Sequence, residues 1–179
     1  RPMYVMVRAE DPNDPDGKTV NALYTHHYLD PDSPHTLELF GNTPFAPGMD
    51  RDIYWHEFGH YLNESVSAES GIDFAGDSGA QFTEGAALHE CLADYLAESV
   101  GNKGYIGRWI ARNFPNIRPG DPLRSAEAKA DDYNDFRLVS TFDASGKNFN
   151  RYRMAEWCSR VLWDICAQFV KEDESTGAI

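Results

Sequence analysis

Two histidines four residues apart, with a glutamate next to the first, are the residues of this chain best suited to chemistry. The run His56-Glu57-Phe58-Gly59-His60 has the pattern H-E-x-x-H. Residues four apart share one helix face, so both imidazoles can reach one zinc ion at about 2.0–2.1 Å. Glu57 then lies beside the ion as a general base. The pattern predicts a zinc site with His56 and His60 as ligands; the competing interpretation is two surface histidines beside a salt-bridging glutamate.

A catalytic zinc ion takes three protein ligands and keeps a fourth position open, so a third donor must come from elsewhere. Glu90 and Asp94 stand four residues apart among apolar neighbours, which predicts two carboxylates on one buried helix face. We expect Glu90 to be the third ligand and Asp94 to hydrogen-bond a ligand imidazole. Glu84 and His89 are the alternative third ligands.

The elements that position these residues differ between the two parts of the chain. β-Branched and aromatic residues between turn-forming Pro, Asp and Gly predict strands at residues 3–8, 21–28 and 37–40. We therefore expect one α+β domain over residues 1–179. Its residues 1–49 form a small N-terminal mixed or antiparallel sheet, and its residues 50–179 are mainly helical.

Three main helices follow from the helical spacing of apolar residues. They are expected at residues 50–66, 83–101 and 149–170, with a shorter helix at 104–114. A long loop is expected at 67–82, and the acidic residues 171–174 are expected to fray. The expected buried stripe of the last helix is Trp157, Val161, Leu162, Ile165 and Phe169.

Taken in order, these motifs resemble the gluzincin metallopeptidases of the thermolysin and fungalysin type. The resemblance covers about residues 20–100, through H-E-x-x-H, the later E-x-x-x-D, Asn21-Ala22-Leu23-Tyr24, and Asp52 four residues before the first histidine. It implies a zincin-like catalytic domain, a peptide or protein substrate whose main chain is held at Asn21 and Ala22, and a secreted or periplasmic location. The metzincin class is excluded, because Asn63 and Val66 stand where it needs Gly and His.

The chain departs from this family beyond residue 100. The family has a later histidine that binds the transition-state oxyanion, whereas the last histidine here is His89. Tyr152 is the best substitute, with an arginine of the last helix as the alternative. The resemblance implies a calcium site at Asp52, but Gly101 stands where a further ligating Glu would be, so the chain leaves a structural Ca²⁺ open. The acidic loop at residues 11–17 is a weaker candidate for calcium, because it lacks the later bidentate Glu of a calcium-binding loop.

The resemblance implies a zinc-dependent endopeptidase. Glu57 would take a proton from the zinc-bound water and pass it to the leaving amine. Tyr152 or an arginine would stabilise the oxyanion. One alternative is a catalytically weak or inactive domain whose fold is held together by zinc (a zinc-stapled domain) and which acts as a binding module. Another is a zinc hydrolase of non-peptide amides.

Net charge and composition limit the kinds of partner that the chain can bind. The 179 residues carry a formal net charge of −13, which repels phosphate backbones, so we expect no nucleic-acid partner. No apolar run approaches the roughly 20 residues that cross a bilayer.

The three cysteines predict packed thiols with at most one bridge. It does not join Cys158 to Cys166, which are about 12 Å apart on one helix. The chain lacks an initial Met, so we expect a piece of a longer precursor, and its oligomeric state stays open.

Overall fold

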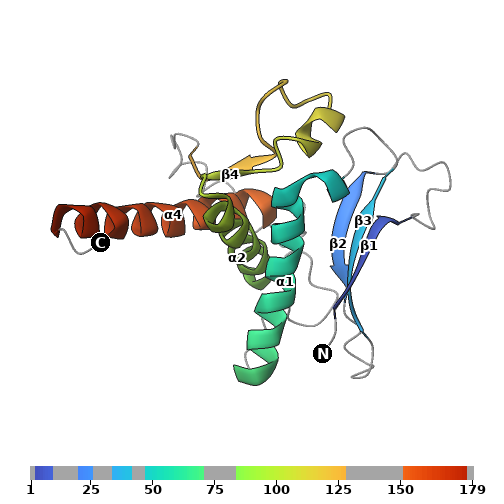
Figure 1. Ribbon diagram of the computed structural model, residues 1–179, viewed down its shortest axis with the longest axis horizontal. Coiled ribbons are helices and arrows are strands. Elements are labelled where there is room, and N and C mark those ends of the chain that lie inside the picture. The colour runs from blue at the N-terminus through green and yellow to red at the C-terminus, as the bar shows by residue number, and fades with distance from the viewer. Residues whose placement is uncertain are drawn as a thin grey trace, which may run out of the picture.

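The computed structural model describes residues 3–9, 20–25, 34–41, 47–70, 84–127 and 151–176. Within them the chain is a mixed α+β structure with three long helices and a small mixed sheet, which confirms the expected class (Figure 1). The elements are β1 (Met3–Ala9), β2 (Asn21–Thr25), β3 (His35–Phe40), η1 (Pro47–Met49), α1 (Arg51–Ser70), α2 (Glu84–Gly101), β4 (Tyr105–Ile106), η2 (Ile110–Asn113), β5 (Arg124–Ser125) and α4 (Arg151–Thr176).

The three-stranded sheet has the order β1-β3-β2. β3 pairs with β1 in parallel and with β2 antiparallel, so β2 is an edge strand in the described part of the chain. Alternate residues of β3 point inward, and Leu37 and Leu39 pack with Ile53 of α1 and Ile110 of η2. This small core holds the sheet against α1. Helix α1 lies between the sheet and α2 (Figure 1).

α1 begins where the sequence predicts, because Asp50 is its N-cap. The Oδ1 atom of Asp50 accepts the backbone N–H of Asp52 at 3.1 Å. Its Oδ2 atom accepts the backbone N–H groups of Trp109 and Ile110, at 3.1 and 3.0 Å, at the start of η2. One buried carboxylate therefore ties the N-terminus of α1 to the segment after α2. The helix ends at Ser70, one turn beyond the expected residue 66.

α1 and α2 cross in close contact at a glycine. A Cβ atom on Gly59 would lie 2.7 Å from the Cα atom of Ala93, closer than real side chains approach backbone. Glycine at this position therefore lets the backbones meet. Because Gly59 lies inside the H-E-x-x-H run and Ala93 lies next to Asp94, this contact brings the two motifs together.

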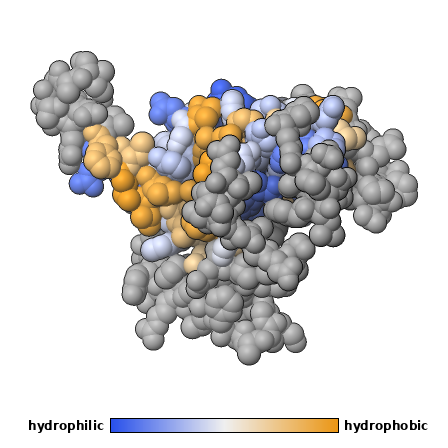
Figure 2. All heavy atoms as spheres, turned by 90° about the horizontal axis from the view of Figure 1, so that it is seen from below, coloured by the Kyte–Doolittle hydropathy of each residue, from blue (hydrophilic) through white to orange (hydrophobic). Residues whose placement is uncertain are grey.

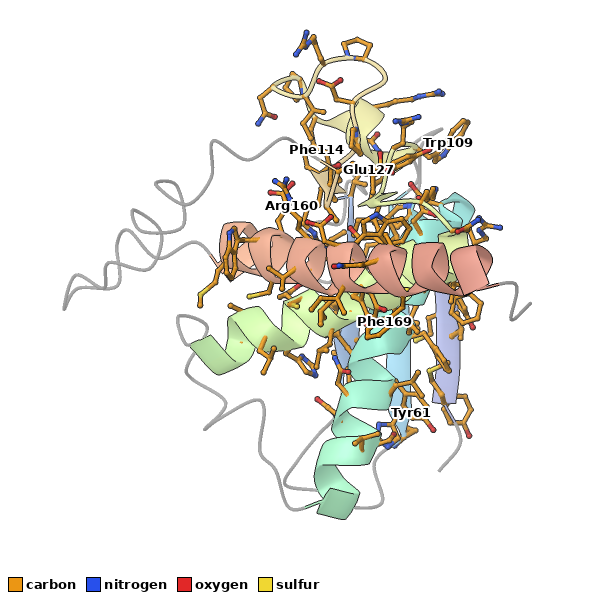
Figure 3. All side chains as sticks on the ribbon, turned by 90° about the vertical axis from the view of Figure 1, so that its left-hand side faces the viewer. Tyr61, Trp109, Phe114, Glu127, Arg160 and Phe169 are labelled. Carbon is orange, nitrogen blue, oxygen red and sulfur yellow. The ribbon has the colours of Figure 1, made fainter. Side chains whose placement is uncertain are left out.

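α4 lies across α2 (Figures 1 and 3), and its expected buried stripe is wrong in part. Ala155 and Ser159 are buried, whereas the side chains of Val161, Ile165 and Phe169 are 39%, 47% and 64% exposed. Small residues form the contact face, because they allow a close crossing, and the larger apolar residues lie outside it. Apolar side chains gather on the α4 side of the molecule in Figure 2.

Trp157 and Leu162 of the same stripe are half-buried. The expected fraying of residues 171–174 is also wrong, because the helix continues to Thr176. No helix in the described ranges is long and apolar enough to cross a membrane.

Residues 104–114 do not form the expected short helix. β4 pairs with β5 there, and only the short η2 turn is helical. Gly107, with φ of +69°, ends the strand in a conformation that residues with a side chain rarely adopt. The β4–β5 pair carries Arg124 back towards α1 and α2.

Candidate metal centre

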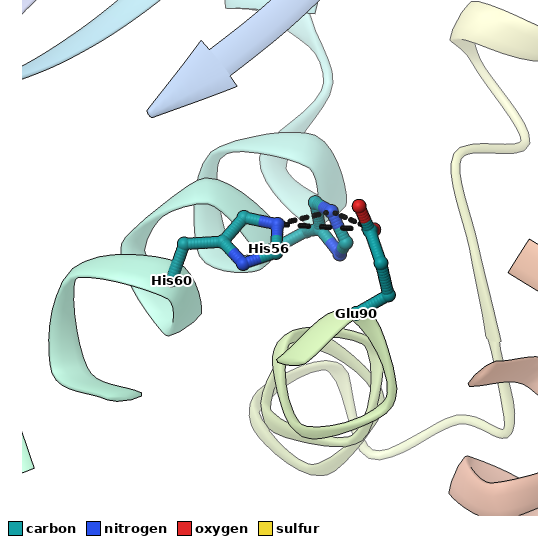
Figure 4. A group of neighbouring side chains, drawn as sticks. All are labelled: His56, His60 and Glu90. Atoms are coloured by element: carbon teal, nitrogen blue, oxygen red, sulfur yellow. Dashed lines mark hydrogen bonds and ion pairs between the residues drawn. The ribbon is translucent and has the colours of Figure 1, made fainter. Parts of the chain in front are cut away.

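Three buried donor atoms from α1 and α2 converge on one point (Figure 4). The Nε2 atoms of His56 and His60 are 3.1 Å apart, and the Glu90 Oε2 atom lies 3.3 Å from the first and 3.8 Å from the second. Tetrahedral ligands about 2.0–2.1 Å from a zinc ion are about 3.3 Å apart. The donor set and its spacing therefore fit a metal ion, and this is the one such group among the described residues.

Asp94 orients the first histidine. Its Oδ1 atom lies 2.8 Å from the Nδ1 atom of His56, and its side chain is 1% exposed. A proton on Nδ1 leaves Nε2 free to act as a donor to a metal. Burial and Arg124 lower the pKa of His56, but Asp94 and Glu90 outweigh them and raise it to about 10. Asp94 therefore lies where the sequence expects the hydrogen-bonding acid.

His89 orients the second histidine rather than joining the donors. The Nδ1 atoms of His89 and His60 are 2.9 Å apart, and their rings are tilted by 30° with centroids 4.5 Å apart. Burial and the neighbouring His56 hold the pKa of His60 well below its ordinary value, which favours the neutral ligand form. Of the two alternatives to Glu90 as third ligand, His89 therefore contacts the Nδ1 atom of His60 and does not join the donor group. The side chain of the other alternative, Glu84, lies outside the described residues.

Glu57 is buried beside the donor group without belonging to it. The backbone N–H of Tyr24 donates to its carboxylate, so β2 passes along the site. Burial, and then the charge of Glu90, raise the pKa of Glu57 to about 7 despite the opposing effect of His56. A carboxyl group of this kind can accept and return a proton near neutral pH.

The edge strand β2 is fixed to α1 by the side chain of Tyr24. Its hydroxyl donates to Glu64 Oε2 at 2.8 Å and hydrogen-bonds the Nδ1 atom of His35. Asn21 is exposed and Ala22 is half-buried on this strand. Both expected substrate-binding residues therefore lie on the edge strand that passes Glu57.

Arg124 enters the site from β5, and no motif in the sequence pointed to it. Its Nη2 atom lies 2.7 Å from Asp94 Oδ1 and 3.2 Å from His56 Nδ1. The exposed ring of Tyr152 lies 5.2 Å from the Arg124 guanidinium carbon. Tyr152 contacts Arg124, which in turn contacts His56. The arginine of the site comes from the β4–β5 pair, whereas the sequence suggested one from the last helix, whose Arg151 and Arg153 side chains are not described.

Asp52, where the resemblance allows a calcium ion, is bound by groups of the protein itself. Asp52 Oδ2 lies 2.6 Å from the Lys103 ammonium and 3.3 Å from the backbone nitrogen of Gly107. A lysine therefore supplies the positive charge next to Asp52. The acidic loop at residues 11–17 lies outside the described residues.

No protein-family model, curated protein or solved structure matches the chain. The gluzincin resemblance therefore depends on the motif residues themselves.

Proposed function

We propose that the chain is a zinc-dependent endopeptidase of the gluzincin type. One observation carries the proposal: His56, His60 and Glu90 bring three donor atoms within 4 Å of one another, with the buried carboxylate of Glu57 beside them. Two imidazoles and one carboxylate are a donor set that catalytic zinc uses in peptidases. A bound zinc ion would polarise the scissile carbonyl and make water a stronger nucleophile at neutral pH.

The chain's own residues supply the remaining steps. Glu57 takes a proton from the attacking water and gives it to the leaving amine, for which its buried position and raised pKa suit it. The edge of β2 away from β3, which has no strand partner in the described ranges, holds an extended peptide at Asn21 and Ala22 by strand addition. The guanidinium of Arg124, stacked on Tyr152, holds a substrate oxygen close to the histidines.

Replacement of Glu57 tests this assignment. Glu57→Gln keeps the shape of the side chain and removes its basicity, so we expect one zinc ion per chain and at least a 100-fold loss of hydrolysis. Zinc content is measured by elemental analysis, and hydrolysis with a fluorescent casein, with and without chelator. Glu38→Gln, at a half-buried position of β3, is the matched control and should keep full activity. Retained hydrolysis in Glu57→Gln, or activity that ignores the chelator, would contradict the mechanism.

A second candidate function is a zinc-stapled domain that binds a partner without hydrolysis. Two features favour it: no histidine follows His89 in the sequence, and Arg124 lies against a metal-binding imidazole. The same assay separates the two functions. One zinc ion per chain with no cleavage of any peptide substrate would support the binding module.

A further inference from the structure

A pair of thiols joins α2 to α4 outside the metal centre. Cys91 of α2 is buried, and Cys158 of α4 is half-buried. The two thiols hydrogen-bond each other across the packed interface of α2 and α4. They are far apart in the sequence and meet only because the helices cross. Neither residue takes part in the proposed peptidase chemistry.

The third cysteine has a different neighbour. The thiol of Cys166, two turns further along α4, hydrogen-bonds Tyr95 of α2. Cys166 is about 12 Å from Cys158 along the helix, which is too far for a disulfide between them. Among the three cysteines, the structure therefore pairs Cys91 with Cys158 alone.

We propose that Cys91 and Cys158 form a reversible disulfide that locks α4 onto α2. The oxidant class is a small-molecule disulfide such as oxidised glutathione. The Cys158 thiolate attacks one sulfur of this disulfide, and the first glutathione leaves and takes up the proton that Cys158 lost. The sulfur of Cys91 then attacks Cys158, and the second glutathione leaves with the proton of Cys91. Two cysteines lose two electrons in total, and one glutathione disulfide becomes two thiols.

The order of the two attacks follows from exposure. Cys158 is the more exposed thiol, whereas Cys91 is 1% exposed and meets the oxidant only through its partner. The hydrogen bond from Cys91 also lowers the pKa of Cys158, which increases its thiolate fraction. Cys158 is therefore the attacking residue, and Cys91 is the resolving one.

A disulfide that fixes α4 to α2 also affects the position of Arg124 beside the metal centre. Glu156, two residues before Cys158, accepts the backbone N–H of Ser125 through its Oε1 atom at 2.8 Å. Ser125 follows Arg124, whose guanidinium contacts Asp94 and His56. A bond between α2 and α4 thus fixes the strand that presents Arg124.

The test is a disulfide map of the whole chain in glutathione redox buffers. After equilibration, free thiols are blocked with N-ethylmaleimide and the non-reduced digest is analysed by mass spectrometry. We expect one linked peptide pair, which contains Cys91 and Cys158, in the unaltered chain and in Cys166→Ser. Closing a loop of about 67 residues should raise the melting temperature by roughly 10 °C over the reduced form.

Single replacements make the assignment specific. Cys91→Ser and Cys158→Ser should show no linked pair and no change of melting temperature on oxidation. If either variant fails to fold, the map of the unaltered chain and of Cys166→Ser still decides the question. A link that involves Cys166, links between chains, or three blocked thiols at the most oxidising ratio would overturn the proposal.

Discussion

Asp94 is the residue at which a candidate metal ligand, His56, and Arg124 meet. Its Oδ1 atom contacts both the Nδ1 atom of His56 and the guanidinium of Arg124, at 2.8 and 2.7 Å. A buried carboxylate with two such partners fixes the tautomer and the direction of the imidazole while it neutralises the arginine. Removing its charge should therefore weaken metal binding without removing a ligand.

We expect Asp94→Asn to lower zinc affinity by about 10–100-fold, because the amide holds the His56 N–H more weakly and leaves Arg124 uncompensated. Competition with a fluorescent chelator measures the dissociation constant. The exposed Asp121→Asn is the control and should bind zinc as the unaltered chain does. An unchanged affinity in Asp94→Asn would show that His56 needs no such support.

At the residue scale, the sequence predicts the three residues whose donor atoms converge better than it predicts the side chains that contact them. The spacing of His56, His60 and Glu90 can be read because four residues make about one helical turn. Arg124 lies in no pattern that points to the site, and the sequence offered His89 only as an alternative third ligand. Their contacts with the two histidines depend on how β5 and α2 are placed in three dimensions.

At the scale of elements, the crossing of α1 and α2 decides the geometry of the site. The crossing depends on Gly59, because a Cβ atom there would lie 2.7 Å from the Cα atom of Ala93. The neighbour is backbone and cannot turn aside as a flexible side chain would. The distance between the histidine pair and Glu90 therefore depends on a residue without a side chain.

Gly59→Ala should destabilise the protein by about 1–3 kcal/mol and weaken zinc binding, since the helices must separate. The sign is diagnostic, because the same change inside an ordinary helix adds about 1 kcal/mol of stability. Urea denaturation and zinc titration measure the two effects. Gly101→Ala is the matched control, since the added methyl meets only the flexible side chain of Lys103. Stabilisation by Gly59→Ala would contradict the close crossing.

Helices next to the motifs were predictable, and those that depend on long-range packing were not. α1 and α2 carry clear signals, such as the helical spacing of the two histidines and the expected end at Gly101. The stripe on α4 was wrong because a purely apolar pattern cannot show that small residues form the contact. The helix predicted at 104–114 was wrong, because β4 pairs with β5, which begins at Arg124, 19 positions after the start of β4.

At the scale of the whole molecule, the pH dependence of stability reports on one buried acid. Glu98 of α2 is 1% exposed, and its Oε2 atom has no hydrogen-bond partner among the described residues. Burial, followed by the charge of Asp94, raises its pKa from 4.5 to about 8, although Ala126 donates a backbone hydrogen bond and Arg124 lies near. The folded protein therefore holds a proton that the unfolded chain loses above pH 4.5.

The sign of the linkage follows from this difference. Between pH 4.5 and about 8 the folded state binds more protons at Glu98 than the unfolded state does. The free energy of unfolding therefore falls as the pH rises through this window, by up to about 1.4 kcal/mol per pH unit, and the loss is complete above the folded pKa. In a protein with a net charge of −13, this adds to the general repulsion that grows with pH.

Glu98→Gln should remove this dependence, because an amide does not titrate. We expect the variant and the unaltered chain to have similar stability at pH 5, and the variant to be more stable by about 2–4 kcal/mol at pH 8.5. Urea denaturation at half-unit steps of pH gives the difference curve, in which groups common to both proteins cancel. Glu127→Gln, at an exposed position, is the control and should follow the unaltered chain. A flat difference curve would mean that Glu98 is ionised in the folded state, with Arg124 as its counter-ion.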